Sequence, residues 1–146
     1  MIVADRLTRF DRARWAALWG SYLAFYDTTV PDAQYDLTWA KLMDGRILGW
    51  AARSDGQMVG IAHAFFHEHG WAATPALYLQ DLFVDPSARG TGAGRALLDA
   101  VIAHGRDAGA SRIYWTTGQD NAAARRLYER VAAWDGSIRY DAPPPG

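Results

Sequence analysis

A glycine-rich stretch between two arginines is the part of the sequence whose residue types and spacing point most directly to chemistry. It reads Arg89-Gly90-Thr91-Gly92-Ala93-Gly94-Arg95, follows an apolar run and leads directly into a predicted helix. Glycines allow the backbone to approach a ligand closely, and the first amides of a helix are unpaired donors at its positive end. The stretch therefore predicts an anion-binding site, most often one for phosphate.

Two common phosphate-binding loops do not fit this stretch. A Walker A loop ends in Gly-Lys-Ser/Thr, whereas Gly94 is followed by Arg95. A dinucleotide-binding fingerprint needs Gly-x-Gly-x-x-Gly, and its sixth position, counted from Gly90 or Gly92, is Arg95 or Leu97. What remains is an Arg-x-x-Gly-x-Gly pattern, with a flexible turn at a strand–helix corner as the purely structural alternative.

Three histidines form a second candidate group. His63, His67 and His69 would share one face of a strand, so a metal site with three ligands is geometrically conceivable. Gly70 and Trp71 indicate that the strand is already ending, and no carboxylate pattern completes a site. We therefore expect no metal, and we expect these histidines to line a substrate cleft or to lie at the surface.

Aromatic side chains could also form the wall of a pocket for an amine, where cation–π attraction is available. The candidates are Tyr26, Trp39 and Trp71, with Asp27 beside the first. Aromatic residues at helical spacing are, however, more often core residues. For Tyr26 both interpretations, pocket wall and core, stay open. The two tryptophans are expected in the core.

The apolar periodicity predicts the elements that must position these residues. We expect helices over 11–26, 32–43 and 91–108, and a fourth that starts near 121 and ends before 135–136. Strands are expected over 1–9, 47–52, 58–67, 76–84, 112–117 and 137–141. The strand–helix–strand run from 76 to 117 predicts a parallel pair, so the fold class is α/β with a mixed sheet and helices on both faces.

The bulk composition limits the classes of function. The 146 residues are 50% hydrophobic with a net charge of −1, which predicts one domain over 1–141 and gives no basic footprint for nucleic acid. The absence of cysteine excludes disulfides, thiolate zinc sites and a cysteine nucleophile, and it suits a reducing, cytoplasmic location. We see no signal peptide and no apolar run of membrane-spanning length. Residues 142–146 are expected to form an extended or disordered tail.

Three motifs together resemble the GNAT superfamily of N-acetyltransferases. The segment 89–94, opening a helix after an apolar strand, looks like the family's acetyl-coenzyme A loop, and 121–128 resembles its later Asn-x-x-Ala-x-x-x-Tyr helix. The strand 78–84, Tyr-Leu-Gln-Asp-Leu-Phe-Val, is similar to that of the spermidine/spermine N-acetyltransferases and related small-amine enzymes. The order of elements matches as well. The resemblance therefore implies a single GNAT domain with a mixed, mostly antiparallel sheet and a splayed parallel strand pair.

The resemblance also implies how acetyl-coenzyme A (acetyl-CoA) would bind. The amides of the glycine-rich loop would hold the pyrophosphate, the backbone of the preceding strand would pair with the pantetheine arm, and the start of the last helix would contact that arm from the other side. The residues expected to bind the donor are Leu82, Phe83, Val84, Arg89, Gly90, Thr91, Gly92, Ala93, Gly94, Arg95, Asn121 and Ala124.

The resemblance implies a residue for the general acid but none for the general base. Tyr128 would protonate the departing thiolate, although a core tyrosine is the alternative because it shares an apolar helix side with Leu127. An alkylammonium must lose about three pK units of proton affinity, roughly 4 kcal/mol, to attack at neutral pH. Gln80 stands where the polyamine enzymes carry a glutamate and cannot take that proton, and alternation places Asp81 on the opposite face as a structural residue. Water, a backbone carbonyl or a less basic substrate could serve instead.

The sequence thus predicts an N-acetyltransferase that moves the acetyl group of acetyl-CoA to the primary amine of a small molecule, by direct attack in a ternary complex without a metal. Tyr26, Asp27 and Gln80 are the expected acceptor-side residues. A coenzyme A-binding domain without turnover, which Gln80 favours, and an acetyltransferase of protein or peptide amines are the alternatives. Because little chain follows Tyr140 for the family's usual second terminal strand, we expect a homodimer in which a partner chain completes the sheet edge.

Overall fold

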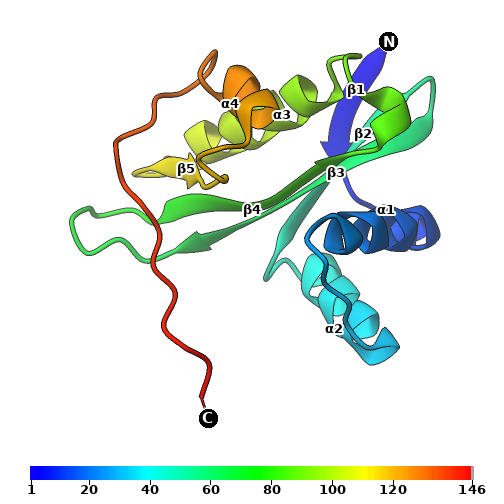
Figure 1. The fold of residues 1–146 in the computed structure, drawn as a ribbon, viewed down its shortest axis with the longest axis horizontal. Helices are drawn as coiled ribbons and strands as arrows, with labels where there is room; N and C mark the ends of the chain where they lie inside the picture. The colour runs from blue at the N-terminus through cyan, green and yellow to red at the C-terminus, as the bar shows by residue number, and fades with distance from the viewer. Residues whose placement is uncertain (146) are drawn as a thin grey trace. The chain divides into compact units, whose positions relative to one another are not determined.

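A five-stranded sheet organises the computed structural model, which describes residues 1–145 (Figure 1). Its strands are β1 (Ile2–Arg6), β2 (Leu48–Ser54), β3 (Gln57–His67), β4 (Ala76–Val84) and β5 (Ile113–Trp115). The helices are α1 (Arg12–Phe25), α2 (Asp32–Met43), α3 (Ala93–Asp107) and α4 (Ala122–Tyr128), with short 3-10 turns η1 (Arg9–Asp11) and η2 (Pro86–Ala88). Within the described part of the chain, no helix has the length and apolar character that a membrane span requires. The chain divides into two compact units, 1–116 and the part from Thr117 onward.

The strand order in the first unit is β1-β2-β3-β4-β5. The first three pairings are antiparallel, whereas β4 and β5 are parallel, as a strand–helix–strand crossover requires. β5 pairs only with the first half of β4, from Leu77 opposite Ile113 to Leu79 opposite Trp115. The expected mixed sheet with a parallel pair is therefore confirmed.

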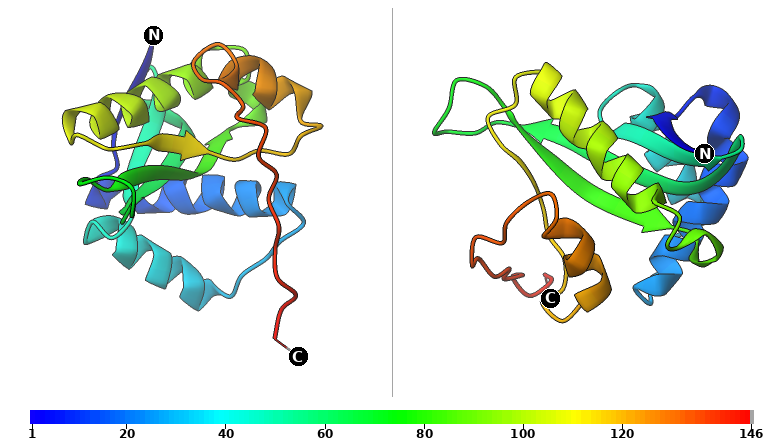
Figure 2. Two further views of the ribbon diagram at one scale, coloured as in Figure 1. Left: turned by 90° about the vertical axis from the view of Figure 1, so that its left-hand side faces the viewer. Right: turned by 90° about the horizontal axis from the view of Figure 1, so that it is seen from above.

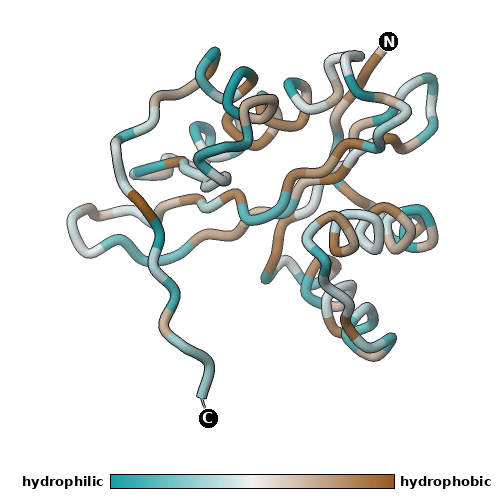
Figure 3. Tube along the Cα trace, in the orientation of Figure 1, coloured by the Kyte–Doolittle hydropathy of each residue, from teal (hydrophilic) through white to brown (hydrophobic). Residues whose placement is uncertain are grey.

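Helices cover both faces of this sheet, with α1 and α2 on one side and α3 on the other (Figure 2). Figure 3 shows the apolar residues gathered along the central strands. The core on the α1 side contains Trp15, Leu18, Trp19, Trp39, Leu42, Ala51, Met58, Ile61 and Phe83. On the other side α3 lies so close that a Cβ on Gly105 would be 2.7 Å from Ile113 Cδ1 and 3.0 Å from Leu77 Cδ2. The glycine is what permits this close approach.

A β-bulge interrupts the pairing of β3 with β4. His63 lies opposite Asp81 and the next pair is Ala64 with Leu79, so Gln80 has no counterpart on β3. The bulge inverts the alternation of side chains: Leu77 lies on the α3 side, whereas Asp81 contacts His63 on the α1 side. A regular strand would have placed Asp81 on the same side as Leu77, and the bulge reverses this. The expectation that Asp81 points away from Gln80 stays a prediction.

The second unit differs most from the sequence-based expectations. α4 ends at Tyr128 rather than near 134. Beyond it the amides of Arg130 and Val131 bond three residues back, at 3.2 and 3.1 Å, and Ala132 N closes the turn on Tyr128 O at 2.9 Å. The strand expected over 137–141 is wrong: none is present there in the described residues, and Trp134 Nε1 donates to Ser137 O in a local turn. Residues 142–145 have no regular structure, and Gly146 lies outside the described residues.

Candidate functional site

The loop between β4 and α3 is tied down at its start by Asp85. This carboxylate accepts hydrogen bonds from Ser87 N at 3.0 Å and Ser87 Oγ at 2.8 Å, and Arg14 Nη2 lies 3.3 Å from its second oxygen. The Ser87 hydrogen bonds, followed by the Arg14 charge, lower the pKa of Asp85 below its ordinary value. An ionised Asp85 thus anchors α1 to the first turn of the loop.

The glycine-rich part of the loop has the geometry of an anion site. Gly90 and Gly92 have φ angles of 78° and 92°, in the left-handed region that favours glycine, and nothing lies within 4 Å of where their Cβ atoms would be. The first bond of α3 runs from Ala96 N to Gly92 O at 3.0 Å, and no side chain caps the helix. Thr91 N bonds to Ala88 O at 3.4 Å, and the amides of 92–95 are those that stay available at the positive end of the helix.

The remaining loop residues frame these amides. Arg89, Thr91 and Arg95 are exposed, and Arg95 is held by Asp99 through an Nε–Oδ1 contact of 3.0 Å one helical turn on. Ala93 is buried and Gly94 partly buried, which seats the first turn of α3 against the sheet. The loop thus offers donors and cations on its outer side.

β4 presents an open backbone edge directly before this loop. The pairing of β5 with β4 ends at Leu79, so no strand within residues 1–145 pairs with Leu82, Phe83 or Val84 on that side. An unpaired strand edge can accept an extended ligand as an additional strand. The splay expected between the parallel strands is present (Figure 1).

The two residues of the second motif lie in the second unit. Asn121 caps α4 by accepting a hydrogen bond from Ala124 N at 3.3 Å, which explains the choice of asparagine at that position. Tyr128 is the last residue of α4 and is partly buried. Arg125 lies on the same helix with its guanidinium over the Trp134 ring, 5.1 Å from the centroid.

The expected acceptor-side residues are all exposed. Tyr26 is 56% exposed and packs edge-on against Tyr22 and Phe25, each with ring centroids 5.1 Å apart. Asp27 follows with a φ of 51°, and Gln80 lies exposed at the bulge. They are available to a ligand, and their roles stay predictions.

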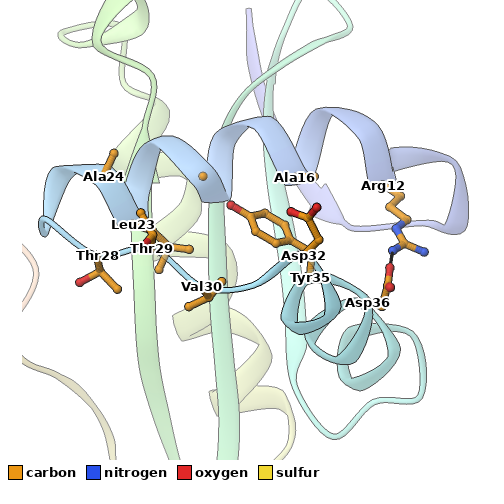
Figure 4. Close-up of a pocket in the computed structure, with 11 residues that line it drawn as sticks. Arg12, Ala16, Leu23, Ala24, Thr28, Thr29, Val30, Asp32, Tyr35 and Asp36 are labelled. Atoms are coloured by element: carbon orange, nitrogen blue, oxygen red, sulfur yellow. Dashed lines mark hydrogen bonds and ion pairs between the residues drawn. The ribbon is translucent and has the colours of Figure 1, made fainter.

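The first unit also has a hollow of about 440 Å³, which lies between α1, α2 and the segment that joins them (Figure 4). Arg12 and Asp36 form an ion pair at one end of it, and Tyr35 and Asp32 project into it from α2. Tyr26 and Asp27 are not among its lining residues.

The structure corrects two expectations about aromatic residues and histidines. Trp39 is a core residue as expected, but Trp71 is 95% exposed in the β3–β4 loop. His67 bonds Tyr114 Oη at 2.7 Å and His69 bonds Ser111 Oγ at 3.0 Å, both partly exposed. His63 is only 1% exposed, so its placement at a cleft or surface was wrong. No group of metal-binding side chains occurs in residues 1–145.

The sequence interpretation missed a buried chain of hydrogen bonds that ends at the bulge. Trp15 Nε1 lies 2.9 Å from His63 Nε2, and His63 Nδ1 lies 2.8 Å from Asp81 Oδ2. The available signal was a polar residue at position 81, where the alternation of Leu77, Leu79 and Phe83 calls for an apolar one. A polar side chain at a core-facing position requires a buried partner, and here it is His63.

Comparison with known proteins decides the family. The sequence model described as "Acetyltransferase (GNAT) family" matches residues 15–133. The chain belongs to the GNAT acetyltransferase family. This GNAT enzyme is 30% identical over 143 residues to the D-amino-acid N-acetyltransferase HPA3 of Saccharomyces cerevisiae, covering 95% of the chain and 89% of that protein. It is 36% identical over 99 residues to the mycothiol acetyltransferase of Nocardiopsis dassonvillei, of which the match spans 30%.

Solved structures establish the GNAT fold independently. A probable acetyltransferase superposes with a TM-score of 0.87 at 20% identity, covering 100% of this chain and 99% of the other. The aminoglycoside acetyltransferase AAC(6')-Iy, in complex with a CoA bisubstrate analogue, superposes with a TM-score of 0.85 at 17% identity, with 100% and 99% coverage. The protein is thus a GNAT N-acetyltransferase with acetyl-CoA as its donor, and the uncapped α3 N-terminus beside an open strand edge suits that donor.

Proposed function

We propose that this GNAT acetyltransferase acetylates the primary amine of a small molecule by direct attack of the amine on acetyl-CoA in a ternary complex. The observation that carries the proposal is the open edge of β4 beside the free amides of α3. An extended thioester lying along that edge would hold its carbonyl beside the bulge, where an amine can reach it. A cytoplasmic location remains a prediction from the lack of cysteine.

In this proposal the amides of 90–95 bind the pyrophosphate, and the backbone of Leu82–Val84 pairs with the pantetheine arm. Asn121 and Ala124 contact that arm, and Tyr128 protonates the thiolate. Arg89 and Arg95 add positive charge outside the loop. Tyr26, Asp27 and Gln80 contact the acceptor.

A small acceptor is supported by two independent likenesses. The yeast relative is named for D-amino acids, which are small amines, and the match covers nearly the whole of both chains. The segment 78–84 resembles the strand of the spermidine/spermine enzymes, but Gln80 replaces their glutamate. We therefore favour an acceptor with a single ammonium group over a polyamine. The aromatic side chains of the protein can attract that one cation.

The test is an acceptor panel, assayed by release of free coenzyme A thiol. It compares D- and L-amino acids, arylalkylamines, polyamines, an aminoglycoside and a peptide with a free amino terminus, with an acceptor-free blank for hydrolysis. We expect kcat/KM for the best small amine to exceed that for the peptide by about 10²-fold or more. Contacts with the remote parts of a peptide raise kcat/KM only when the site is shaped to receive those parts. A preference for the peptide, or acetyl-CoA binding without turnover of any amine, would overturn the proposal.

A further inference from the structure

The chain Trp15–His63–Asp81 is the one buried polar connection between α1, β3 and the β4 bulge that the residues 1–145 show. Trp15 is 0% exposed and His63 is 1% exposed, and both ring nitrogens of His63 have partners. The chain ends at the Asp81 side chain, which is 18% exposed. Protein encloses the Trp15 end of this hydrogen-bonded chain, and solvent reaches the Asp81 end.

The partners fix the tautomer of His63. An indole N–H can only donate a hydrogen bond, so His63 Nε2 must be the acceptor from Trp15. The proton of the neutral ring then lies on Nδ1 and is donated to Asp81 Oδ2. A second proton on Nε2 would face the indole N–H, so the chain has no place for it. The Asp81 carboxylate is the member of the chain that retains capacity to accept a proton.

The bulge places this carboxylate on the α1 side of the sheet, where the acceptor amine is proposed to bind. Asp81 Oδ1 has no hydrogen-bond partner among the described residues and is not buried. His63 is also the only cationic or potentially cationic side chain that contacts Asp81 within residues 1–145. Asp81 directly precedes Leu82, where the open edge of β4 is expected to hold the thioester arm.

Aromatic rings lie on the same face, close to Asp81. Phe83, two residues along β4, contacts Tyr22 with ring centroids 6.0 Å apart, and Tyr22 contacts Tyr26 at 5.1 Å. Ring faces attract an ammonium group, and this cluster runs from the exposed ring of Tyr26 to the buried ring of Phe83, two residues from Asp81.

We propose that Asp81 is the proton acceptor for the substrate ammonium, and that Trp15 and His63 are positioning residues that hold its carboxylate. This inference rests on the proposed acetylation of an amine. One ammonium proton passes to Asp81 Oδ1, and the amine nitrogen bonds to the thioester carbonyl carbon as the C=O π bond opens to an oxyanion. The oxyanion collapses and the carbon–sulfur bond breaks. The thiolate takes the hydroxyl proton of Tyr128, the second proton of the adduct nitrogen restores that hydroxyl, and Asp81 returns its proton to solvent. Asp81 thereby accepts the proton that the side chain of Gln80, at the neighbouring position, cannot take.

The first experiment compares Asp81→Asn with wild type, using the best acceptor and a fluorinated analogue whose amine is largely unprotonated at pH 7. For the ordinary amine, we expect kcat/KM at pH 7 to fall by about 10²–10³-fold, the range for a lost general base, and to recover as the pH rises. For the fluorinated amine, the two enzymes should differ by less than about 10-fold, since there is no proton left to remove. Asp5→Asn, which changes another strand carboxylate to an amide, is the control and should leave both rates unchanged.

The outcomes separate the two proposals. If wild type acetylates no amine, the proposed function fails. If wild type is active but Asp81→Asn lowers the rates of both acceptors equally, Asp81 is a structural residue and only the present inference fails.

The positioning role has its own test in two variants of His63. The side-chain nitrogen of asparagine replaces Nδ1, whereas that of glutamine replaces Nε2. His63→Asn should therefore keep kcat within about 10-fold of wild type, and His63→Gln should fall as far as Asp81→Asn and recover with pH in the same way. Equal losses in both variants, without pH recovery, contradict the proposal.

A measurement on the wild type keeps the inference falsifiable if these variants do not fold. Nitrogen-15 NMR of the histidine rings at pH 7 distinguishes the two neutral tautomers and the charged form. We expect a single neutral Nδ1–H form for the buried His63. An Nε2–H tautomer or a charged ring would overturn the inference.

Discussion

Tyr128 is the residue on which release of coenzyme A depends in the proposed reaction. Replacing it with phenylalanine removes one hydroxyl group and keeps the ring that packs at the end of α4. We expect Tyr128→Phe to lower kcat by about 10²–10⁴-fold, as for other lost general acids, with calorimetric binding of acetyl-CoA nearly unchanged. Tyr140→Phe removes the same group from a tyrosine that is 84% exposed and serves as the control. Unchanged turnover in Tyr128→Phe would exclude the acid role.

At the residue scale, the sequence predicted features that depend on neighbours in the chain. Gly90, Gly92 and the start of α3 are adjacent, so the loop geometry followed from local rules. The role of His63 did not, because its partners lie 48 residues earlier and 18 residues later, and the pairing with Asp81 depends on a bulge that no glycine or proline marks. Such contacts are set by tertiary packing, which spacing alone does not encode.

The loop at the start of α3 can be tested as an element with a strain-matched control. Gly92→Asp places a negative charge and a side chain at a φ of 92°, beside the amides proposed to bind pyrophosphate. We expect no acetyl-CoA binding detectable by calorimetry, because the carboxylate would repel the phosphates. Gly56→Asp imposes similar strain, at a φ of 86°, in the β2–β3 turn. It should lose similar stability and bind normally, and normal binding by Gly92→Asp would show that the loop is wrongly assigned.

The turn η1 makes a pH-dependent contribution to stability through Asp11. Burial raises the pKa of this carboxyl, but hydrogen bonds from Arg53 and Thr8 outweigh burial and hold the pKa below its ordinary value. Because the pKa is lower in the folded state, the stabilisation is present above the unfolded pKa, about 4, and is lost as the pH falls through the folded pKa.

Asp11→Asn should accordingly lower the free energy of unfolding by about 1.5–3 kcal/mol at pH 7, the range for hydrogen bonds to charged groups. In urea unfolding at pH 3 the variant and wild type should move closer together. Asp55→Asn, at a side chain 88% exposed in a turn, should change little at either pH. A difference that is equal at both pH values would contradict the assignment.

At the scale of elements, periodicity predicted α2 and β4 with the observed bounds and the other long elements to within a few residues. It failed after Tyr128, where apolar residues continue at helical spacing but the backbone does not. Trp134 bonds to Ser137 O and stacks with Arg125, and these contacts favour a turn over another helical turn. Local side-chain contacts of this kind compete with propensity and are not visible in the pattern.

At the scale of the whole molecule, the segment 137–141 bears on whether two copies of the chain associate. It was expected to be a strand, and no strand pairs with it among the described residues. Ile138 is 63% exposed and Tyr140 84% exposed, so two large apolar side chains are left to solvent. Exposed apolar segments can add to the sheet edge of a second copy of the chain, and symmetric dimers are the commonest homo-oligomers.

We predict a homodimer in which this segment completes a sheet edge of the partner. Solution scattering at working concentration should give about twice the mass of one 16.1 kDa chain. Ile138→Asp would place a charge at the shared edge and should shift the mass toward the monomer, because burying an unpaired charge is unfavourable. Ala142→Asp introduces the same charge just beyond the segment and should leave the dimer intact. A monomeric mass for the wild type would count decisively against the shared edge, and the exposed side chains of Ile138 and Tyr140 would then have another role.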